Sequence, residues 1–153
     1  MKNPVRAPVA LAMLAACTFG AASPAMAACP SVGLRLGKAV FQTAKGKFSY
    51  RVEVAASPAD QECGLMFRKA MRRDSGMIFP FVPPRTATFW MENTELPLDL
   101  IFYSSGGRVI SIGRGKPFTR ELIPSGGVAA GVIELNLGEA QRIGLQPGDR
   151  VRY

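Results

Sequence analysis

The chain has 153 residues, with 19 Lys and Arg against 11 Asp and Glu, and no histidine. This length suits one domain, and the missing imidazole removes the commonest general base and metal ligand at neutral pH. The basic residues are spread along the chain, apart from a cluster at residues 68–73. We therefore expect a solvated basic surface, and no nucleic-acid partner.

Residues 1–27 are expected to be an export signal. Lys2 and Arg6 precede an apolar run at 9–19 that is too short to span a bilayer, and Ala25-Met26-Ala27 offers small residues to a signal peptidase. Cleavage after Ala27 leaves 17 basic and 11 acidic residues, a net charge of +6. No other stretch predicts a transmembrane helix.

A second interpretation of the same segment stays open. Residues 14–17, Leu-Ala-Ala-Cys, have the form of a lipoprotein box, which would put a lipid anchor on Cys17. Both interpretations place the protein in the periplasm or outside the cell, and it contacts the membrane only if Cys17 is lipidated. Cys29 and Cys63 remain in either case. In an oxidising compartment they predict one disulfide, and a free, buried Cys63 is the alternative.

The first half of the remaining chain predicts a hairpin and a helix. Residues 34–42 and 48–54 alternate apolar and polar side chains around the turn signal Lys45-Gly46, which indicates two paired strands. Ser57, Pro58 and Asp60 are typical of a helix start, and we expect this helix to run to about Phe67 or Arg68.

The second half predicts short strands separated by Gly and Pro turns. We expect strands at 76–81, 86–91, 98–103, 108–112 and 128–137, a helical turn at 139–143 and a final strand after 149. Pro80 indicates an edge or bulge, and the loop 113–127 is long enough for a lid. The pattern predicts one mainly β domain over residues 28–153, a compact sandwich, jelly roll or barrel with one or two short helices, and a βαβ parallel sheet is not expected.

Three separated motifs resemble one protein family. They are GLMFR from Gly64, GMIFPF from Gly76 and FWMENTELPLDLIF from Phe89, and GLQPGDRV from Gly144 fits the same family's C-terminal end. The family is the domain of unknown function 192, and the resemblance covers about Lys47 to Tyr153. It implies a compact, mainly β, usually exported domain, and it brings no known reaction.

Two positions depart from the pattern that the resemblance implies. Glu92 stands where the family more often has lysine, which alters the charge of any site beside Trp90. Cys63 stands where a polar residue is usual, which supports a disulfide particular to this chain.

The segment 64–99 is the predicted site, because it holds the only tryptophan and the motif residues. Trp90 alternates out of phase with Phe89 and Met91, so it faces either solvent or a cleft. An aromatic face beside Asn93 and Asp99 is typical of a binding edge for a sugar or another polar ligand. If Asp99 is buried it needs a partner, and Arg68 is the expected one.

We therefore predict a non-catalytic binding module of the cell envelope, for a small polar ligand, a glycan or a partner protein. The ligand would lie in a cleft lined by Trp90, Asn93, Asp99 and Arg68. No cofactor is expected, and the sequence leaves the oligomeric state open. A core position for Trp90 would make the motif a folding signature instead.

Two alternative functions, glycan hydrolysis and copper(I) binding, are suggested by particular side chains. Asp99 with a second carboxylate, Glu92 or Glu95, would suit glycan hydrolysis, where one carboxyl acts as acid and the other as base or nucleophile. Met66, Met77 and Met91 carry soft thioethers suited to copper(I), although methionines in packed segments are more often core fillers.

Overall fold

The computed structural model describes Cys29 and residues 33–153. The predicted export signal, and the alternative lipid anchor on Cys17, lie outside the described residues and stay predictions. Nowhere in the described range is a helix long and apolar enough to cross a membrane.

The described part of the chain holds nine strands and two short helices. In chain order they are β1 (Leu36–Thr43), β2 (Gly46–Val54), α1 (Pro58–Cys63), β3 (Ser75–Arg85), β4 (Thr88–Phe89), β5 (Leu98–Tyr103), β6 (Val109–Gly115), β7 (Ile123–Pro124), β8 (Ala129–Asn136), α2 (Glu139–Ile143) and β9 (Arg150–Arg152).

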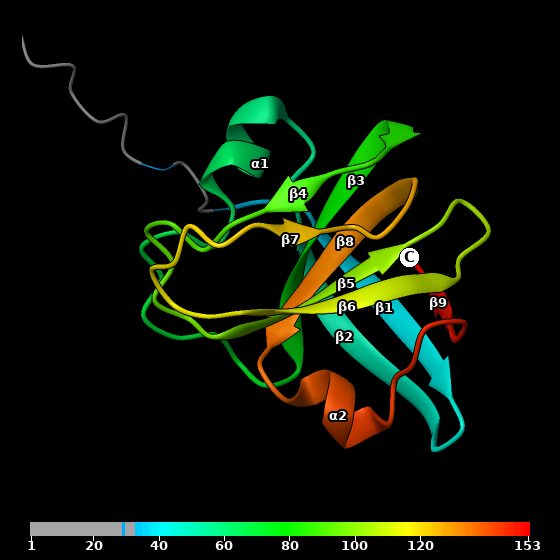
Figure 1. The fold of residues 1–153 in the computed structure, drawn as a ribbon. Coiled ribbons are helices and arrows are strands. Elements are labelled where there is room, and N and C mark those ends of the chain that lie inside the picture. Colours follow the sequence, from blue (N-terminus) through cyan, green and yellow to red (C-terminus); the bar gives the residue numbers. More distant parts are fainter. Residues whose placement is uncertain (1–28, 30–32) are drawn as a thin grey trace, which may run out of the picture.

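Seven strands form one twisted sheet in the order β6-β5-β8-β3-β2-β1-β9, and β4 pairs with β7 separately (Figure 1). The two edges of the large sheet approach each other at a single antiparallel bridge between Arg108 and Arg150. The sheet is therefore bent toward a barrel without closing. This confirms the predicted mainly β domain with two short helices.

The β1–β2 hairpin is confirmed, with Thr43 opposite Gly46 at its turn. β2 and β3 are parallel neighbours joined through α1, while the other pairs of the large sheet are antiparallel. The sheet is therefore not a βαβ parallel sheet, as the sequence predicted from the single helix between strands. A single crossover of about twenty residues is enough for one parallel pair.

Helix α1 begins as predicted and ends earlier than predicted. Ser57 caps it, with Ser57 Oγ accepting from the backbone N–H of Asp60, and Pro58 takes the first helical position. The helix stops at Cys63 because Gly64 (φ 48°) and Phe67 (φ 62°) both lie in the left-handed region. The chain from Gly64 to Arg68 is consequently irregular, and it turns back toward β4.

Three other boundaries differ from the expectations. Strand β3 continues to Arg85, beyond the predicted end at Phe81, and its ladder with β8 shifts register between Pro80 and Arg85. That shift confirms the irregularity expected at Pro80. The predicted lid at 113–127 is partly structured, since residues up to Gly115 extend β6 and Ile123–Pro124 form β7. Strand β7 pairs with β4, which shortens the strand expected at 86–91 to two residues.

Strand β8 lies between β5 and β3 and contributes to two apolar clusters, one on each face of the sheet. Ile133 and Leu135 join the cluster that includes Ala140 and Ile143 of α2. Val132 and Ala129 join the second cluster, which contains Phe79, Leu100 and Met91. The candidate site opens on the side of this second cluster.

Candidate functional site

A cleft of about 700 Å³ lies between α1, the chain after it, β3 and the segment 85–94. Its described lining residues are Cys29, Ala59, Gln61, Glu62, Cys63, Gly64, Leu65, Met66, Phe67, Phe79, Arg85, Ala87, Thr88, Phe89, Trp90, Met91, Glu92, Asn93, Thr94 and Glu134.

One side of the cleft is built from aromatic rings. We call Phe79, Phe89 and Trp90 the aromatic wall; Phe79 and Phe89 meet edge to face with ring centroids 5.4 Å apart. Gly64 allows this packing, because a Cβ there would lie 3.2 Å from Cζ of Phe79. The wall gives the cleft an apolar interior with exposed ring surface.

Glu134 is the polar group inside this apolar cleft. It lies on β8 opposite Met77 of β3 and Leu100 of β5, and only 5% of the residue is exposed. Among the described residues its carboxyl has no hydrogen-bond or ion-pair partner, although it lines the cleft. Burial raises the pKa of Glu134 to about 8, so the carboxyl is mostly protonated at neutral pH.

The sequence analysis missed Glu134. We predicted a strand at 128–137 and assigned no role to its glutamate. The signal that could have found it is the run Val132-Ile133-Glu134-Leu135, which is apolar on both sides of the glutamate. Such a run is typical of a strand covered on both faces, where any carboxylate must be buried.

The mouth of the cleft carries Trp90 and two residues in unusual backbone conformations. Trp90 is 48% exposed, so the core alternative for this residue is wrong. Phe67 and Asn93 both have positive φ, and the Phe67 N–H donates to the Asn93 carbonyl over 2.8 Å. Non-glycine residues are costly in this region and are often found at ligand sites. Trp90 and Asn93 thus lie where the sequence prediction put them, while their role in binding stays a prediction.

Asp99 does not lie in the cleft. It lies on β5, opposite Leu135 of β8, so its side chain is on the same face of the sheet as Ile101 and α2. One carboxylate oxygen accepts from the backbone N–H groups of Gly138 and Ala140, each over 2.9 Å. Burial raises the pKa of Asp99, and these two hydrogen bonds partly offset the rise. Asp99 therefore supplies the N-terminal cap that Gly138, which has no side chain, cannot give to α2.

Arg68 is also placed differently from the prediction. Its guanidinium binds both carboxylate oxygens of Glu53, over 2.5 and 2.7 Å, and it is not among the described residues that line the cleft. The expected pair between Arg68 and Asp99 is therefore wrong. Sequence spacing could not show that β2 passes beside Arg68 while α2 covers Asp99.

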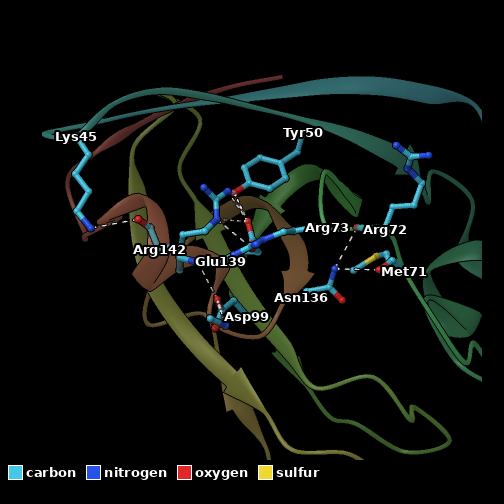
Figure 2. A network of polar contacts seen from close by, with 11 residues as sticks. Lys45, Tyr50, Met71, Arg72, Arg73, Asp99, Asn136, Glu139 and Arg142 are labelled. Atoms are coloured by element: carbon cyan, nitrogen blue, oxygen red, sulfur yellow. Dashed lines mark hydrogen bonds and ion pairs between the residues drawn. The ribbon is translucent and has the colours of Figure 1, made fainter.

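A second polar cluster, at α2, is fully paired. Glu139 accepts from Arg142, Arg73 and Tyr50, and Asn136 holds the backbone carbonyls of Met71 and Arg72 nearby (Figure 2). Burial tends to raise the pKa of Glu139, but the hydrogen bonds from the two arginines and Tyr50 outweigh it and lower the pKa to about 2. Each of these groups has its partner within the chain, so the cluster is structural.

The remaining carboxylates do not form a pair with Asp99. Glu92 is bound by Arg120, and Glu95 by Lys69 at 3.0 Å. Because Asp99 faces α2 and Glu92 faces the cleft, the two lie on different sides of the sheet. This arrangement does not support glycan hydrolysis by Asp99.

The three motif methionines lie on the cleft side of the sheet. Met66 and Met91 line the cleft, and Met77 is fully buried next to Glu134 in the β3–β8 ladder. In the part of the chain that the structure describes, no three Cys, Asp or Glu side chains gather as a metal site. Any metal site here would depend on the thioethers.

Cys29 and Cys63 are joined by a disulfide, with Cα atoms 5.4 Å apart. Both cysteines line the cleft, so the bond fixes the segment at Cys29 to the end of α1 beside the opening. The alternative, a free buried Cys63, is not what the structure shows.

The fold and the cleft together define a mainly β domain in which the carboxyl of Glu134 lines an aromatic cleft. The chain belongs to the DUF192 family, described as Uncharacterized ACR, whose model matches residues 40–153. This confirms the resemblance seen in the motifs.

Two crystal structures are similar to this chain. A protein of unknown function from Novosphingobium aromaticivorans DSM 12444 is 39% identical, with a TM-score of 0.78 over 81% of this chain and 89% of that one. A protein from Sinorhizobium meliloti 1021, named as a candidate transcription regulator, is 38% identical, with a TM-score of 0.76 over 79% of this chain and 95% of that one. A search of the curated proteins finds no match.

Proposed function

We propose that this protein is a binding module that holds a small ligand in the aromatic cleft, with Glu134 as the buried polar anchor. The observation that carries the proposal is the carboxyl of Glu134, which lines the cleft among apolar neighbours, is 5% exposed as a residue and has no partner among the described residues. No side-chain polar atom of the described residues is both fully buried and without a partner, so the carboxyl oxygens of Glu134 are accessible from the cleft, where a ligand can bind them.

The shape of the cleft supports the same function. Its volume of about 700 Å³ falls in the range of small-molecule sites, which are mostly apolar with a few placed polar groups. Trp90 and Asn93 at its mouth would contact the ligand, as expected from the sequence. Arg68 and Asp99, which the sequence also suggested, have structural partners instead.

We further propose that binding takes place in the cell envelope or outside the cell. The export signal expected at residues 1–27 supports this location. The disulfide between Cys29 and Cys63 supports it independently, because structural disulfides persist in oxidising compartments.

The test is methyl NMR of the methionines with phenethyl alcohol, a neutral probe that has an aromatic body and one polar group. Met66 and Met91 line the cleft, so their methyl signals should shift with saturation as the probe is added. Met71 does not line it and serves as an internal control. Equal shifts at Met71, or none at Met66 and Met91, would count against a small-molecule site.

Copper(I) binding is a second candidate, because Met66 and Met91 reach the same cleft as Glu134. Thioethers and one carboxylate would be the available ligands. Copper(I) should then quench the fluorescence of Trp90, the only tryptophan, and the quenching should be lost in Met91→Leu. Unchanged quenching in that variant would remove this candidate.

A further inference from the structure

We propose that the ligand of the cleft is an organic cation, a protonated amine whose nitrogen pairs with Glu134 and whose apolar body packs on the aromatic wall. This inference rests on the proposed binding function and names its ligand class. It is argued from the charge of the cleft, the chemistry of its lining and the geometry of Glu134.

The described lining of the cleft carries more acidic than basic side chains, although the chain as a whole is basic. The whole chain has a net charge of +8, whereas the lining holds Glu62 of α1, Glu92 and Glu134 against Arg85. Glu92 is paired with Arg120 and Glu134 is mostly protonated at neutral pH, so Glu134 becomes a negative charge only when it loses its proton. Arg85 stacks on Phe81, with its guanidinium carbon 4.3 Å from the ring centroid. A protonated amine therefore finds in Glu134 a carboxyl that can ionise to pair with it.

The lining suits an organic cation better than an inorganic one. Aromatic faces attract cations, and their attraction is strongest where water is excluded. The thioethers of Met66 and Met91 are polarisable and adapt to an irregular apolar body. A hard metal ion needs six or more oxygen ligands, and the described lining gives it one buried carboxylate, Glu134.

Glu134 has the geometry of a counter-ion that has no partner in the part of the chain that the structure describes. Its cross-strand neighbours Met77 and Leu100 cannot neutralise it, and among the described residues nothing donates to it. Arg142 and Arg73, the cations that neutralise Glu139, lie on the other face of the sheet at α2. A ligand ammonium entering through the cleft would form the ion pair that the fold leaves open.

Binding of an amine should displace the proton from Glu134. The raised pKa, about 8, means that the empty cleft holds a neutral carboxyl at neutral pH. An ammonium stabilises the ionised form, so its binding should release about one proton below pH 8. The charged groups that share the cleft, Glu62, Glu92 and Arg85, would shift this midpoint without removing the release.

The test compares three probes of similar size: phenethylamine, phenethyl alcohol and phenylacetate. Each is titrated into the full chain by calorimetry near pH 8, where Glu134 is half ionised. We expect phenethylamine to bind at least about tenfold more tightly than the alcohol, and phenylacetate more weakly than both. Buffers of different ionisation enthalpy should report proton release with the amine only.

The matched variants are Glu134→Gln and Glu95→Gln. The first keeps the shape of the anchor and removes its charge, so the affinities for amine and alcohol should become equal within about threefold. The second removes a carboxylate that is paired with Lys69 outside the cleft, and the preference for the amine should remain. If Glu134→Gln does not fold, proton release by the native chain still decides the question.

The outcomes separate the two proposals. If all three probes bind equally well, the cleft is a binding site and the cationic ligand class is wrong. An amine preference that persists in Glu134→Gln, or amine binding without proton release, also overturns the inference. If none of the probes binds or moves the Met66 and Met91 signals, the binding function and its ligand class fail together.

Discussion

Asp99 and Glu134 lie on the neighbouring strands β5 and β8, one residue out of register, and their carboxyl groups therefore lie on opposite faces of the sheet. Asp99 pairs with Leu135, and Glu134 pairs with Leu100. The first carboxylate caps α2 and the second lines the cleft. The two buried acids of the central strands thus have different roles, one structural and one available to a ligand.

The structural role of Asp99 predicts a loss of stability on its removal. Asp99→Ala leaves the N–H groups of Gly138 and Ala140 without their acceptor at the start of α2. We expect a loss of about 2 to 4 kcal/mol in the free energy of unfolding, measured in urea. Probe binding by the folded variant should be unchanged. A loss below about 0.5 kcal/mol would show that water replaces the cap.

The burial of Glu134 predicts an unusual dependence of stability on pH. The folded chain keeps the proton of Glu134 up to about pH 8, whereas the unfolded chain loses it near the ordinary value of 4.5. The free energy of unfolding should therefore fall as pH rises between these values, by about 2 to 4 kcal/mol. Urea unfolding of Glu134→Gln over the same range should show no such fall. A parallel decline in both proteins would assign the effect to other groups.

The lowered pKa of Glu139 predicts that the free energy of unfolding falls as the pH is lowered. Its pKa is lowered to about 2 by Arg142, Arg73 and Tyr50 against the effect of burial, so its stabilisation is complete above about 4.5. That contribution should be lost as pH falls from 4.5 toward 2, by about 1 to 3 kcal/mol after allowing for the exposed arginines. Glu139→Gln should be less stable at neutral pH and show a flatter acid limb. In the lower part of this range, about a pH unit or more below 4.5, Glu134 is protonated in both states and contributes no pH dependence.

The sequence correctly predicted the elements that depend on interactions among a few neighbouring residues. The cap at Ser57, the hairpin around Lys45-Gly46 and the helical turn at 139–143 were all found where the sequence put them. Trp90 is exposed, which is one of the two positions that the sequence left open, although the strand expected at 86–91 ends at Phe89.

The features that the sequence did not predict depend on contacts between residues far apart in the chain. The partner of Asp99 is the backbone of a helix about forty residues away, and helix N–H groups leave no signature in sequence. The parallel β2–β3 pair and the β4–β7 ribbon depend likewise on which segments meet in space. Glu134 was missed because its burial follows from the central position of β8, which becomes evident only once the strand order is known.

The pairing of Arg68 with Glu53 predicts that removing Arg68 destabilises the fold more than removing its neighbour Lys69. Both cations bind a carboxylate, but the Arg68–Glu53 pair is bidentate and its two side chains are about three-quarters buried, whereas the Lys69 side chain is 83% exposed. Arg68→Ala leaves Glu53 unpaired at the side of β2, and we expect a loss of about 1 to 3 kcal/mol. Lys69→Ala should cost no more than about 0.5 kcal/mol, because exposed ion pairs are screened by water and salt. Urea unfolding of the two variants at low and high salt measures the difference. Equal losses would mean that the motif arginine serves something other than this ion pair.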